Sequence, residues 1–416
     1  MKIKKSKTRK IISIFWLYLF PLASFLFYEY VGFNEKQLKM IQFIIVFFAL
    51  IFVLKDLLRK HKQTRYYNIV RILLLLFLFS MIMACLFWEQ SIQLSYRATA
   101  PQSLTILYFF ILFKIKPSRA EIERLIWFFC IVYLLCWVYG IAKAPQLVFG
   151  SEDEFGLSDE RGVYRLFIKG RGFICLGLFL AVSKFIETKR KIWIFIFAGL
   201  FAVIVMHTIR QVIFFSFLVT VGYLLWSKKK LLIFVGILSI GFLFFENKIK
   251  ISDNSIIGSL LALSERQIEE QYSGDENIRI TAYKYLFTEY SANIITDVFG
   301  NGFPHEQSHF GQKELYMKNF LKIFSSDVGY AAIFVRVGWL GLLCYLLIFY
   351  RTIKQKVPPA FMYAKLFIIY MIFANIAASW VYHDMIAICV CLFILECSNL
   401  EQKNEQNEIL DRNTGI

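Results

Sequence analysis

Several arginines stand apart from the obvious basic clusters of this sequence, and their chemistry suits a phosphate group. They are Arg97, Arg161, Arg165, Arg171, Arg210 and Arg279. A guanidinium is planar and permanently charged, so it binds two phosphate oxygens through parallel hydrogen bonds. Several such side chains converging on one place would hold a pyrophosphate at a membrane surface. The alternative, equally open for Arg97 and Arg161 given the acidic residues at 153–160, is pairing with a carboxylate or with lipid headgroups.

Arg210 and Arg171 have the strongest case, because the chain around them leaves little room for a solvated charge. Arg210 stands where two apolar runs are joined almost directly, and Arg171 stands between Gly170 and Gly172 at the start of another run. A charge so close to the membrane interior is expected to have a function or a specific partner. Arg336, inside a later apolar run, fits an interhelical ion pair and a site residue equally well.

Two histidines are candidates for a general base. His305 and His309 share a loop segment that contains Gly302 and Pro304. Imidazole accepts a proton near neutral pH, so either side chain can deprotonate a hydroxyl group. Metal binding is disfavoured, because the pair lacks a third ligand and a His-Glu-x-x-His pattern. For His207 and His383, at the ends of apolar runs, ordinary hydrogen bonding is the favoured interpretation.

The composition shows what must position these side chains. Of the 416 residues, 58% are hydrophobic and 19% are charged, which excludes a soluble enzyme. We expect an all-α, polytopic integral membrane protein, since runs of this length match helices that cross a bilayer. The twelve apolar runs lie at 11–30, 39–55, 68–88, 99–114, 125–142, 171–187, 192–208, 211–227, 231–246, 328–350, 361–380 and 383–398.

The lysines and arginines predict how the helices are oriented. The N-terminal tail and every second connection between the runs are basic, which places both termini in the cytoplasm by the positive-inside rule. Much of the net charge of +17 is therefore topological, and nucleic-acid binding is disfavoured. On these grounds we divide the chain into helices one to nine (1–246), a long outer loop (247–327), helices ten to twelve (328–398) and a cytoplasmic tail (399–416).

Two outer connections are longer than the others, at 143–170 and 247–327. The second is too long for a plain connection, and such loops are typically functional. Its apolar spacing predicts short amphipathic helices at 256–271 and 277–295. A further stretch, 313–324, is expected to lie on a membrane interface through its apolar side chains. The active surface is therefore expected to face outward.

The motifs follow one another in a recognisable order. They are Arg171-Gly172 at a helix mouth, Arg210 between two helices, Arg279, Phe299-Gly300-Asn301-Gly302-Phe303, Ser326-Asp327-Val328-Gly329-Tyr330 and Val337-Gly338-Trp339-Leu340-Gly341. This order, on a twelve-helix topology, resembles the bacterial O-antigen and capsule repeat-unit polymerases and the related O-antigen ligases. The motif part of the resemblance covers about 160–345.

The resemblance implies a membrane glycosyltransferase of the bacterial cytoplasmic membrane. Its substrate would be a polyprenyl-pyrophosphate-linked oligosaccharide, and its protein partners a flippase and a chain-length regulator. Arg210, Arg279, Arg171 and Arg165 would bind the pyrophosphate, with no metal or cofactor required. The ligases have a His-Asn pair where Ser326 and Asp327 stand here, a departure that disfavours the ligase reading. The base stays open among Asp327, His305 and His309.

A lipid-linked oligosaccharide flippase is the main alternative from another class. It would share the many helices, the basic charge and the pyrophosphate lipid. Flippases have two related halves with short loops and a charged central cavity. The sequence shows no internal repeat, and its extramembrane residues are concentrated in one outer loop. This pattern favours a polymerase.

Overall fold

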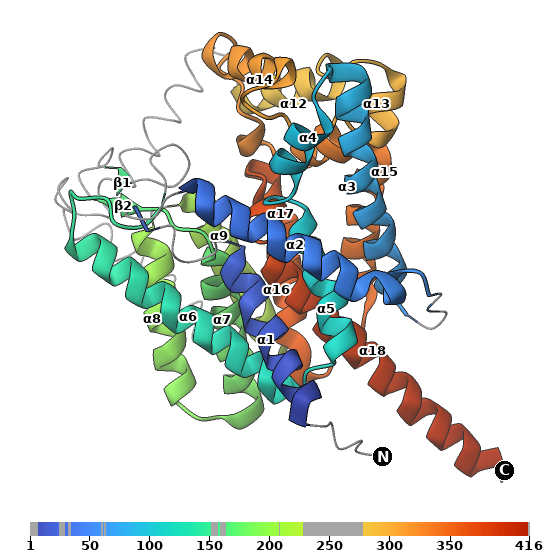
Figure 1. The fold of residues 1–416 in the computed structure, drawn as a ribbon. Helices are drawn as coiled ribbons and strands as arrows, with labels where there is room; N and C mark the ends of the chain where they lie inside the picture. The colour runs from blue at the N-terminus through green and yellow to red at the C-terminus, as the bar shows by residue number, and fades with distance from the viewer. Residues whose placement is uncertain are drawn as a thin grey trace.

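A computed structural model describes residues 7–24, 30–31, 35–59, 61, 64–150, 157–158, 164–207, 209–227 and 278–414. This part of the chain is almost entirely helical (Figure 1). The predicted helices at 231–246 and 256–271, and Arg161, lie outside the described residues.

Ten of the predicted apolar runs each correspond to one main helix. These are α1 (Lys7–Ala23), α2 (Glu35–Leu57), α3 (Tyr67–Trp88), α6 (Arg119–Ala142), α7 (Arg171–Thr188), α8 (Ile192–Met206), α9 (Arg210–Ser227), α15 (Gly329–Lys354), α16 (Met362–Ala377) and α18 (Met385–Thr414). A 3-10 turn, η3 (Pro359–Phe361), precedes α16.

The run predicted at 99–114 is not one straight helix. It begins at the last residue of α4 (Ile92–Thr99) and continues through the 3-10 turn η1 (Leu104–Ile106) into α5 (Leu107–Ile115), so α4 lies almost entirely before the predicted run. The two parts are bent by 60° across the break. Pro101 lies in this break, and proline has no backbone N–H to continue a helix.

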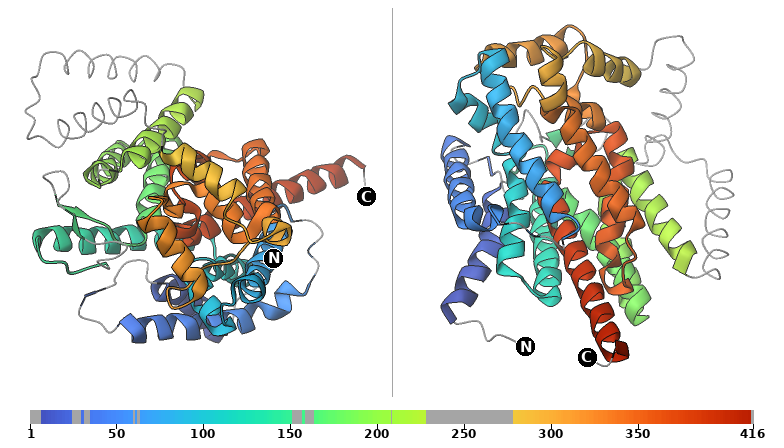
Figure 2. Two further views of the ribbon diagram at one scale, coloured as in Figure 1. Left: turned by 90° about the horizontal axis from the view of Figure 1, so that it is seen from above. Right: turned by 90° about the vertical axis from the view of Figure 1, so that its right-hand side faces the viewer.

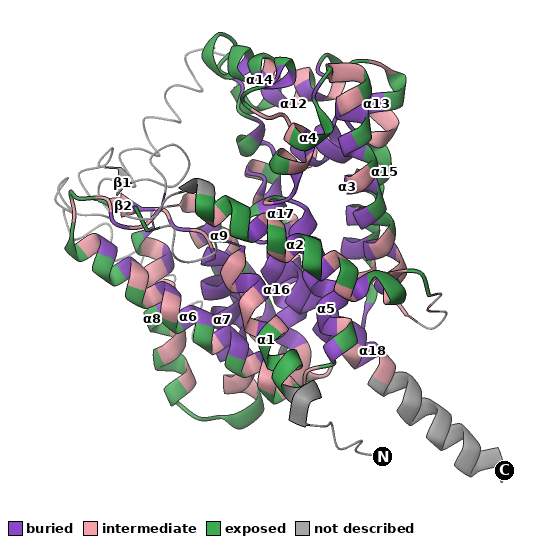
Figure 3. Ribbon diagram, in the orientation of Figure 1, coloured by how far each residue is buried: buried purple, intermediate pink, exposed green. Residues whose placement is uncertain are grey.

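Length and composition show a membrane-embedded helical protein. Within the described residues, five helical segments are long and apolar enough to cross a membrane, and the bent α4–α5 pair would make a sixth. The core lies around α7 and α16, while α2 and α6 lie outside and expose large apolar side chains, as lipid-facing helices do (Figure 3). The twelve crossings and the sidedness stay predictions.

Short helices form a layer at one end of the bundle, which we call the cap. It consists of α12 (Ile278–Thr288), α13 (Ile294–Phe299), α14 (His309–Asn319) and the 3-10 turn η2 (Ser325–Asp327), beside α4 (Figure 1). The beginning of α1 and the end of α18 lie at the opposite end (Figure 2). The predicted topology requires this arrangement, because it puts the long loop and the termini on opposite sides.

The cap differs in detail from the prediction. The helix predicted over 277–295 is two helices, because Asn293 accepts hydrogen bonds from the backbone N–H groups of Ile295 and Thr296 and so begins α13. The stretch 313–324, expected at a membrane interface, overlaps the second half of α14, which begins at His309 and ends at Asn319. Phe320, Leu321 and Phe324 follow α14 and are exposed, as expected for residues at a membrane interface. The other outer connection pairs two short strands, β1 (Leu157–Ser158) and β2 (Arg165–Leu166).

Glycines fasten the cap to α15. The backbone N–H groups of Asn301 and Gly302 donate to the carbonyls of Val335 and Arg336. Gly300 has a φ of 90°, and a side chain there would run into the carbonyl of Arg336. Only glycine combines this backbone conformation with so close an approach. The Gly-Asn-Gly motif therefore positions the long loop against α15.

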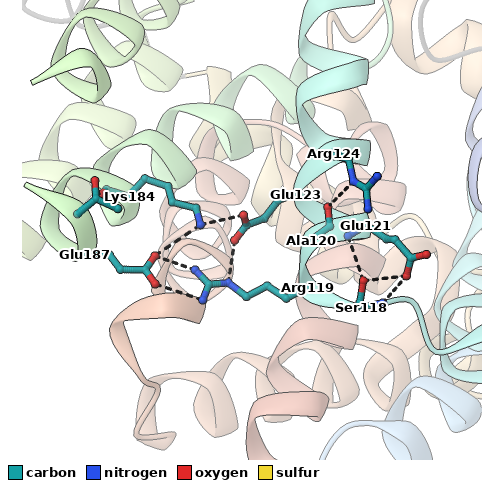
Figure 4. Close-up of polar contacts among 9 residues, drawn as sticks. Ser118, Arg119, Ala120, Glu121, Glu123, Arg124, Lys184 and Glu187 are labelled. Atoms are coloured by element: carbon teal, nitrogen blue, oxygen red, sulfur yellow. Dashed lines mark hydrogen bonds and ion pairs between the residues drawn. The ribbon is translucent and has the colours of Figure 1, made fainter. Parts of the chain in front are cut away.

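Four charged side chains form a closed network near Thr188, the last residue of α7 (Figure 4). Arg119 of α6 contacts Glu123 and Glu187, each at 2.7 Å. Lys184 of α7 lies 2.8 Å from Glu123 and 3.5 Å from Glu187. Every charge in this network faces opposite charges, and the network joins α6 to α7.

Candidate functional site

The helical bundle is interrupted between α16 and α18, and several segments that carry predicted site residues contact this interruption. α16 ends at Ala377, a single turn α17 (Trp380–His383) follows, and α18 begins at Met385. We call residues 376–384 the helix break. It lies below the cap in Figure 1. The predicted runs 361–380 and 383–398 do not reveal this short intervening helix.

Arg171 contacts the helix break directly. Its guanidinium carbon lies 3.6 Å from the centre of the Trp380 ring, and its Nη2 lies 3.8 Å from Oδ2 of Asp384. The side chain is buried. Arg171 was expected to bind a substrate at the surface, but in this conformation Trp380 and Asp384 enclose it.

The glycines on either side of Arg171 have separate roles. Gly170 has a φ of 92°, a left-handed conformation that favours glycine, at the start of α7. The backbone N–H of Gly172 donates to Oδ1 of Asp384 over 3.0 Å. A Cβ at Gly172 would lie 2.6 Å from that oxygen. The Gly-Arg-Gly segment thus brings the beginning of α7 against the carboxylate of Asp384.

Part of this cluster has no hydrogen-bond partner. Within the described structure, the buried atoms Nε and Nη2 of Arg171, Oδ2 of Asp384 and Nδ1 of His207 lack one. Such atoms are rare in folded proteins, because burial without a hydrogen bond is unfavourable. They surround a small cavity of about 20 Å³, also lined by Lys169 and His383, which has room for about one water molecule.

His207 and Tyr133 form the other wall of the cavity. Nε2 of His207 lies 2.8 Å from the hydroxyl of Tyr133. The expectation of ordinary hydrogen bonding is thus confirmed for one nitrogen of His207. The ring of His383, an exposed residue, packs against Trp380 at 5.7 Å.

Arg210 and Arg165 lie on segments that approach the helix break, but neither of them lines the cavity. Arg210 begins α9, three residues after His207, and the amide of the next residue, Gln211, can bridge the Ala377 carbonyl and the indole N–H of Trp380. Arg165 stacks on Phe167, which lines the cavity. Both arginines are only partly buried. The segments that carry them therefore meet at the helix break.

Arg279 and Asp327 approach the helix break from the cap. Arg279 is exposed on α12, where Tyr283, one turn later, donates its hydroxyl hydrogen to the Ile376 carbonyl over 2.6 Å. Asp327 is exposed in η2, and the carbonyl of the preceding Ser326 accepts from the N–H of Ser379. Both segments are thereby attached to the break.

The two candidate histidines have different surroundings. The backbone N–H of His305 donates to the side chain of Gln90, in the α3–α4 connection. Partial burial and the positive charge of Arg97 lower the pKa of His305, which favours the neutral imidazole. His309 is the exposed first residue of α14. The contact of His305 thus joins the cap to the α3–α4 connection, away from the segments that meet at the break.

Arg336 forms an ion pair, the first of its two predicted roles. Its Nη2 lies 3.2 Å from Oε1 of Glu314 in α14, and Glu314 also accepts hydrogen bonds from Ser325 and Tyr290. Burial alone would raise the pKa of Glu314, but Arg336 and these hydrogen bonds outweigh it and lower that pKa. Arg336 therefore ties the cap to α15.

The sequence-based expectations do not include Asp384 or Trp380. Asp384 stands at the mouth of the last apolar run, as Arg171 does at another, so the same reasoning on charges near a membrane could have found it. The contact between the two residues is not visible in the sequence, because 212 positions separate Gly172 from Asp384. Among the described residues, no group of three His, Cys, Asp or Glu side chains could hold a metal ion.

No protein-family model matches the sequence, and no curated protein matches it. A function for this chain must therefore be inferred from its fold and its candidate site.

Proposed function

We propose that this protein polymerises polyprenyl-pyrophosphate-linked oligosaccharide repeat units into a surface polysaccharide, at the outer face of a bacterial cytoplasmic membrane. One observation carries the proposal. Four segments that are far apart in the sequence all contact the helix break. They carry Arg171, Arg210, Arg279 and Asp327. Four of the segments on which the resemblance to repeat-unit polymerases rests thus meet at one place, which supports the proposal.

The chemistry requires two kinds of group. A hydroxyl oxygen of one lipid-linked glycan attacks the anomeric carbon of another, and the bond from that carbon to the pyrophosphate oxygen breaks. The polyprenyl pyrophosphate leaves with the bonding electrons, and a base takes the hydroxyl proton. Fixed cations stabilise the charge that develops on the leaving group. Arginines and a single carboxylate or imidazole are sufficient for this reaction.

Exposure separates the roles of the arginines. Arg279 is exposed and Arg210 and Arg165 are partly exposed, so these side chains are assigned to the pyrophosphate. The buried Arg171 is assigned a positioning role, because its contacts with Trp380 and Asp384 fix the geometry of the break. Asp327 is the preferred base, since it is exposed beside Ser326, whose carbonyl is bonded to the break. His305 and His309 are the alternatives.

The test is a reconstitution of the purified protein in vesicles with a polyprenyl-pyrophosphate-linked repeat unit. A ladder of glycans containing several repeats, formed without nucleotide sugar or another protein, would support the proposal. Movement of the lipid-linked glycan to the opposite leaflet without a ladder would contradict it and indicate a flippase. Transfer of a single glycan to a different lipid acceptor would indicate a ligase.

A further inference from the structure

A second basic site lies at the end of the bundle away from the cap. An open groove of about 330 Å³ is lined by Thr64, Arg65, Arg351 and Asn399. Thr64 and Arg65 precede α3, Arg351 lies in the last turn of α15, and Asn399 belongs to α18. The 26-residue α15 separates the groove from Asp327 and the helix break. The site is thus independent of the outer one.

The two arginines of the groove are held beside each other by the backbone. Nη2 of Arg65 donates to the Arg351 carbonyl over 2.8 Å, and Nη1 of Arg351 donates to the Arg65 carbonyl. The hydroxyl of Tyr66 donates to Gln355 over 2.6 Å, which in turn donates to the Leu395 carbonyl. These bonds join the beginning of α3 to the end of α15 and to α18. Both guanidinium groups are therefore fixed before any ligand arrives.

The carboxylate of Glu396 lies close to the groove but forms no ion pair with either arginine. Glu396 is fully buried and accepts from three consecutive backbone N–H groups, those of Arg65, Tyr66 and Tyr67. It therefore serves as the anion at the start of α3, where helix N–H groups lack partners.

The groove contrasts with other basic positions at this end. Arg119 and Lys184 each face two glutamates, and Lys114 lies 3.0 Å from Asp56. Across the residues with described side chains, no carboxylate lies within ion-pair distance of Arg65 or Arg351. Two buried donors, Nε of Arg65 and Nδ2 of Asn399, have no hydrogen-bond partner there either. Two adjacent positive charges with unused donors are what an anion requires.

An apolar stripe leads to the groove along α15. Leu343, Leu347, Tyr350 and Ile353 are exposed, at helical spacing that places them on one side. A headgroup bound by Arg351 would let its acyl chains follow this stripe. A freely diffusing phosphate would have no use for it.

We propose that this groove binds the phosphate group of an anionic membrane lipid. The guanidinium groups of Arg65 and Arg351 contact the phosphate oxygens, and Nδ2 of Asn399 donates a hydrogen bond to the headgroup. The stripe on α15 holds the acyl chains. The lipid would thereby join α3, α15 and α18 at the end opposite the cap.

Native mass spectrometry of the full-length protein in mixed micelles tests this assignment. The probes are phosphatidylglycerol, phosphatidylcholine and inorganic phosphate. We expect retention of phosphatidylglycerol but not of phosphatidylcholine. Asn399→Asp places a carboxylate in the groove that the arginines line and should weaken this retention by about tenfold or more. Arg190→Gln changes the net charge equally at the same end but outside the groove, and should retain the lipid as the wild type does.

Thermal unfolding shows whether the variants fold. Asn399→Asp should unfold without lipid at or above the wild-type temperature, because its carboxylate pairs with the arginines. Arg65→Gln is the second variant and should lose the lipid as well. Equal retention by the wild type and both groove variants would overturn the proposal, as would an equal loss in Arg190→Gln. If inorganic phosphate raised the unfolding temperature and no lipid were retained, the assignment to a lipid would be overturned.

Discussion

The two ends of α7 carry charged clusters with different surroundings. At one end, Lys184 and Glu187 share a network with Arg119 and Glu123, with side chains 16 to 33% exposed and closest contacts of 2.7 to 2.8 Å. At the other end, Arg171 and Asp384 are 7 and 3% exposed, and their charged atoms stand 3.8 Å apart. Each of these two side chains keeps a buried polar atom without a hydrogen bond in the described structure.

This difference separates a structural cluster from a candidate functional one. Partly exposed ion pairs contribute little to stability, so the network at the Thr188 end mainly orients α6 and α7. Burying an ion pair with imperfect geometry is unfavourable for stability, because the loss of hydration outweighs the attraction between the charges. Such a pair is therefore expected to have a role other than stabilising the fold. Buried charged groups that lack hydrogen bonds are rare in folded proteins, and a functional site is one explanation for them. The Arg171 end of α7 is therefore where an outward-facing site is expected.

The largest contrast should appear in stability. Asp384→Ala leaves the buried guanidinium of Arg171 without its counter-charge and should destabilise the protein by about 3–5 kcal/mol. Glu187→Gln removes one carboxylate from the partly exposed network and should cost about 0–1 kcal/mol. Unfolding in detergent measures both. Similar losses in the two variants would remove the distinction between the ends of α7.

Activity sharpens the comparison at the outer end. Asp327→Asn removes the proposed base and should lower the rate of glycan polymerisation by about a hundredfold, the low end of the range for general base catalysis. His305→Ala should have a smaller effect. Rates from reconstituted vesicles measure the two variants side by side. The reverse order would assign the base to the histidine of the cap.

A charge-preserving change tests how the pyrophosphate is bound. Arg210→Lys keeps the positive charge but loses the two-pronged hydrogen bonding, and should reduce polymerisation by on the order of tenfold or more. Membrane insertion should be unaffected. Arg190→Lys, an equivalent change in the connection between α7 and α8, is the control and should leave glycan length unchanged. Normal glycan length in the Arg210 variant would exclude the proposed pyrophosphate contact.

Two glycines test the close packing at the helix break. A Cβ at Gly172 meets the carboxylate of Asp384, so Gly172→Ala should destabilise the protein by about 1–3 kcal/mol. Gly199 in α8 has no atom within 4 Å of such a Cβ, so Gly199→Ala should be neutral or slightly stabilising. Thermal unfolding of the two variants checks the close approach of α7 to the helix break. Equal stability in both would mean that the approach is not tight.

The apolar runs of the sequence predict the helices well, because a long apolar run has few other stable structures in a membrane. Positions of Arg171 and Arg210 at helix mouths are also predictable. The contact of Arg171 with Trp380 and Asp384 is not, since it joins segments far apart in the chain. That Arg171 is buried is visible only in the packed structure, and its positioning role is inferred from that burial.

In the cap, too, helices can be predicted from nearby residues, whereas contacts between distant residues cannot. Its short helices are predicted by apolar spacing, but the end of α12 and the start of α13 depend on a local capping residue, Asn293. The role of Glu314 depends on Arg336, which belongs to α15 and is 22 positions away. Local patterns therefore predict the elements, whereas the pairing of charges requires the fold.

The most direct test of the account compares glycan ladders made in vesicles by the wild type, Arg171→Lys and Arg119→Lys. Both substitutions keep the charge and remove the planar guanidinium, one from the helix break and one from the closed network. We predict that all three proteins fold, that the wild type and Arg119→Lys make long ladders, and that Arg171→Lys makes almost none. Equal ladders from the two folded variants, or no ladder from the wild type, would contradict it.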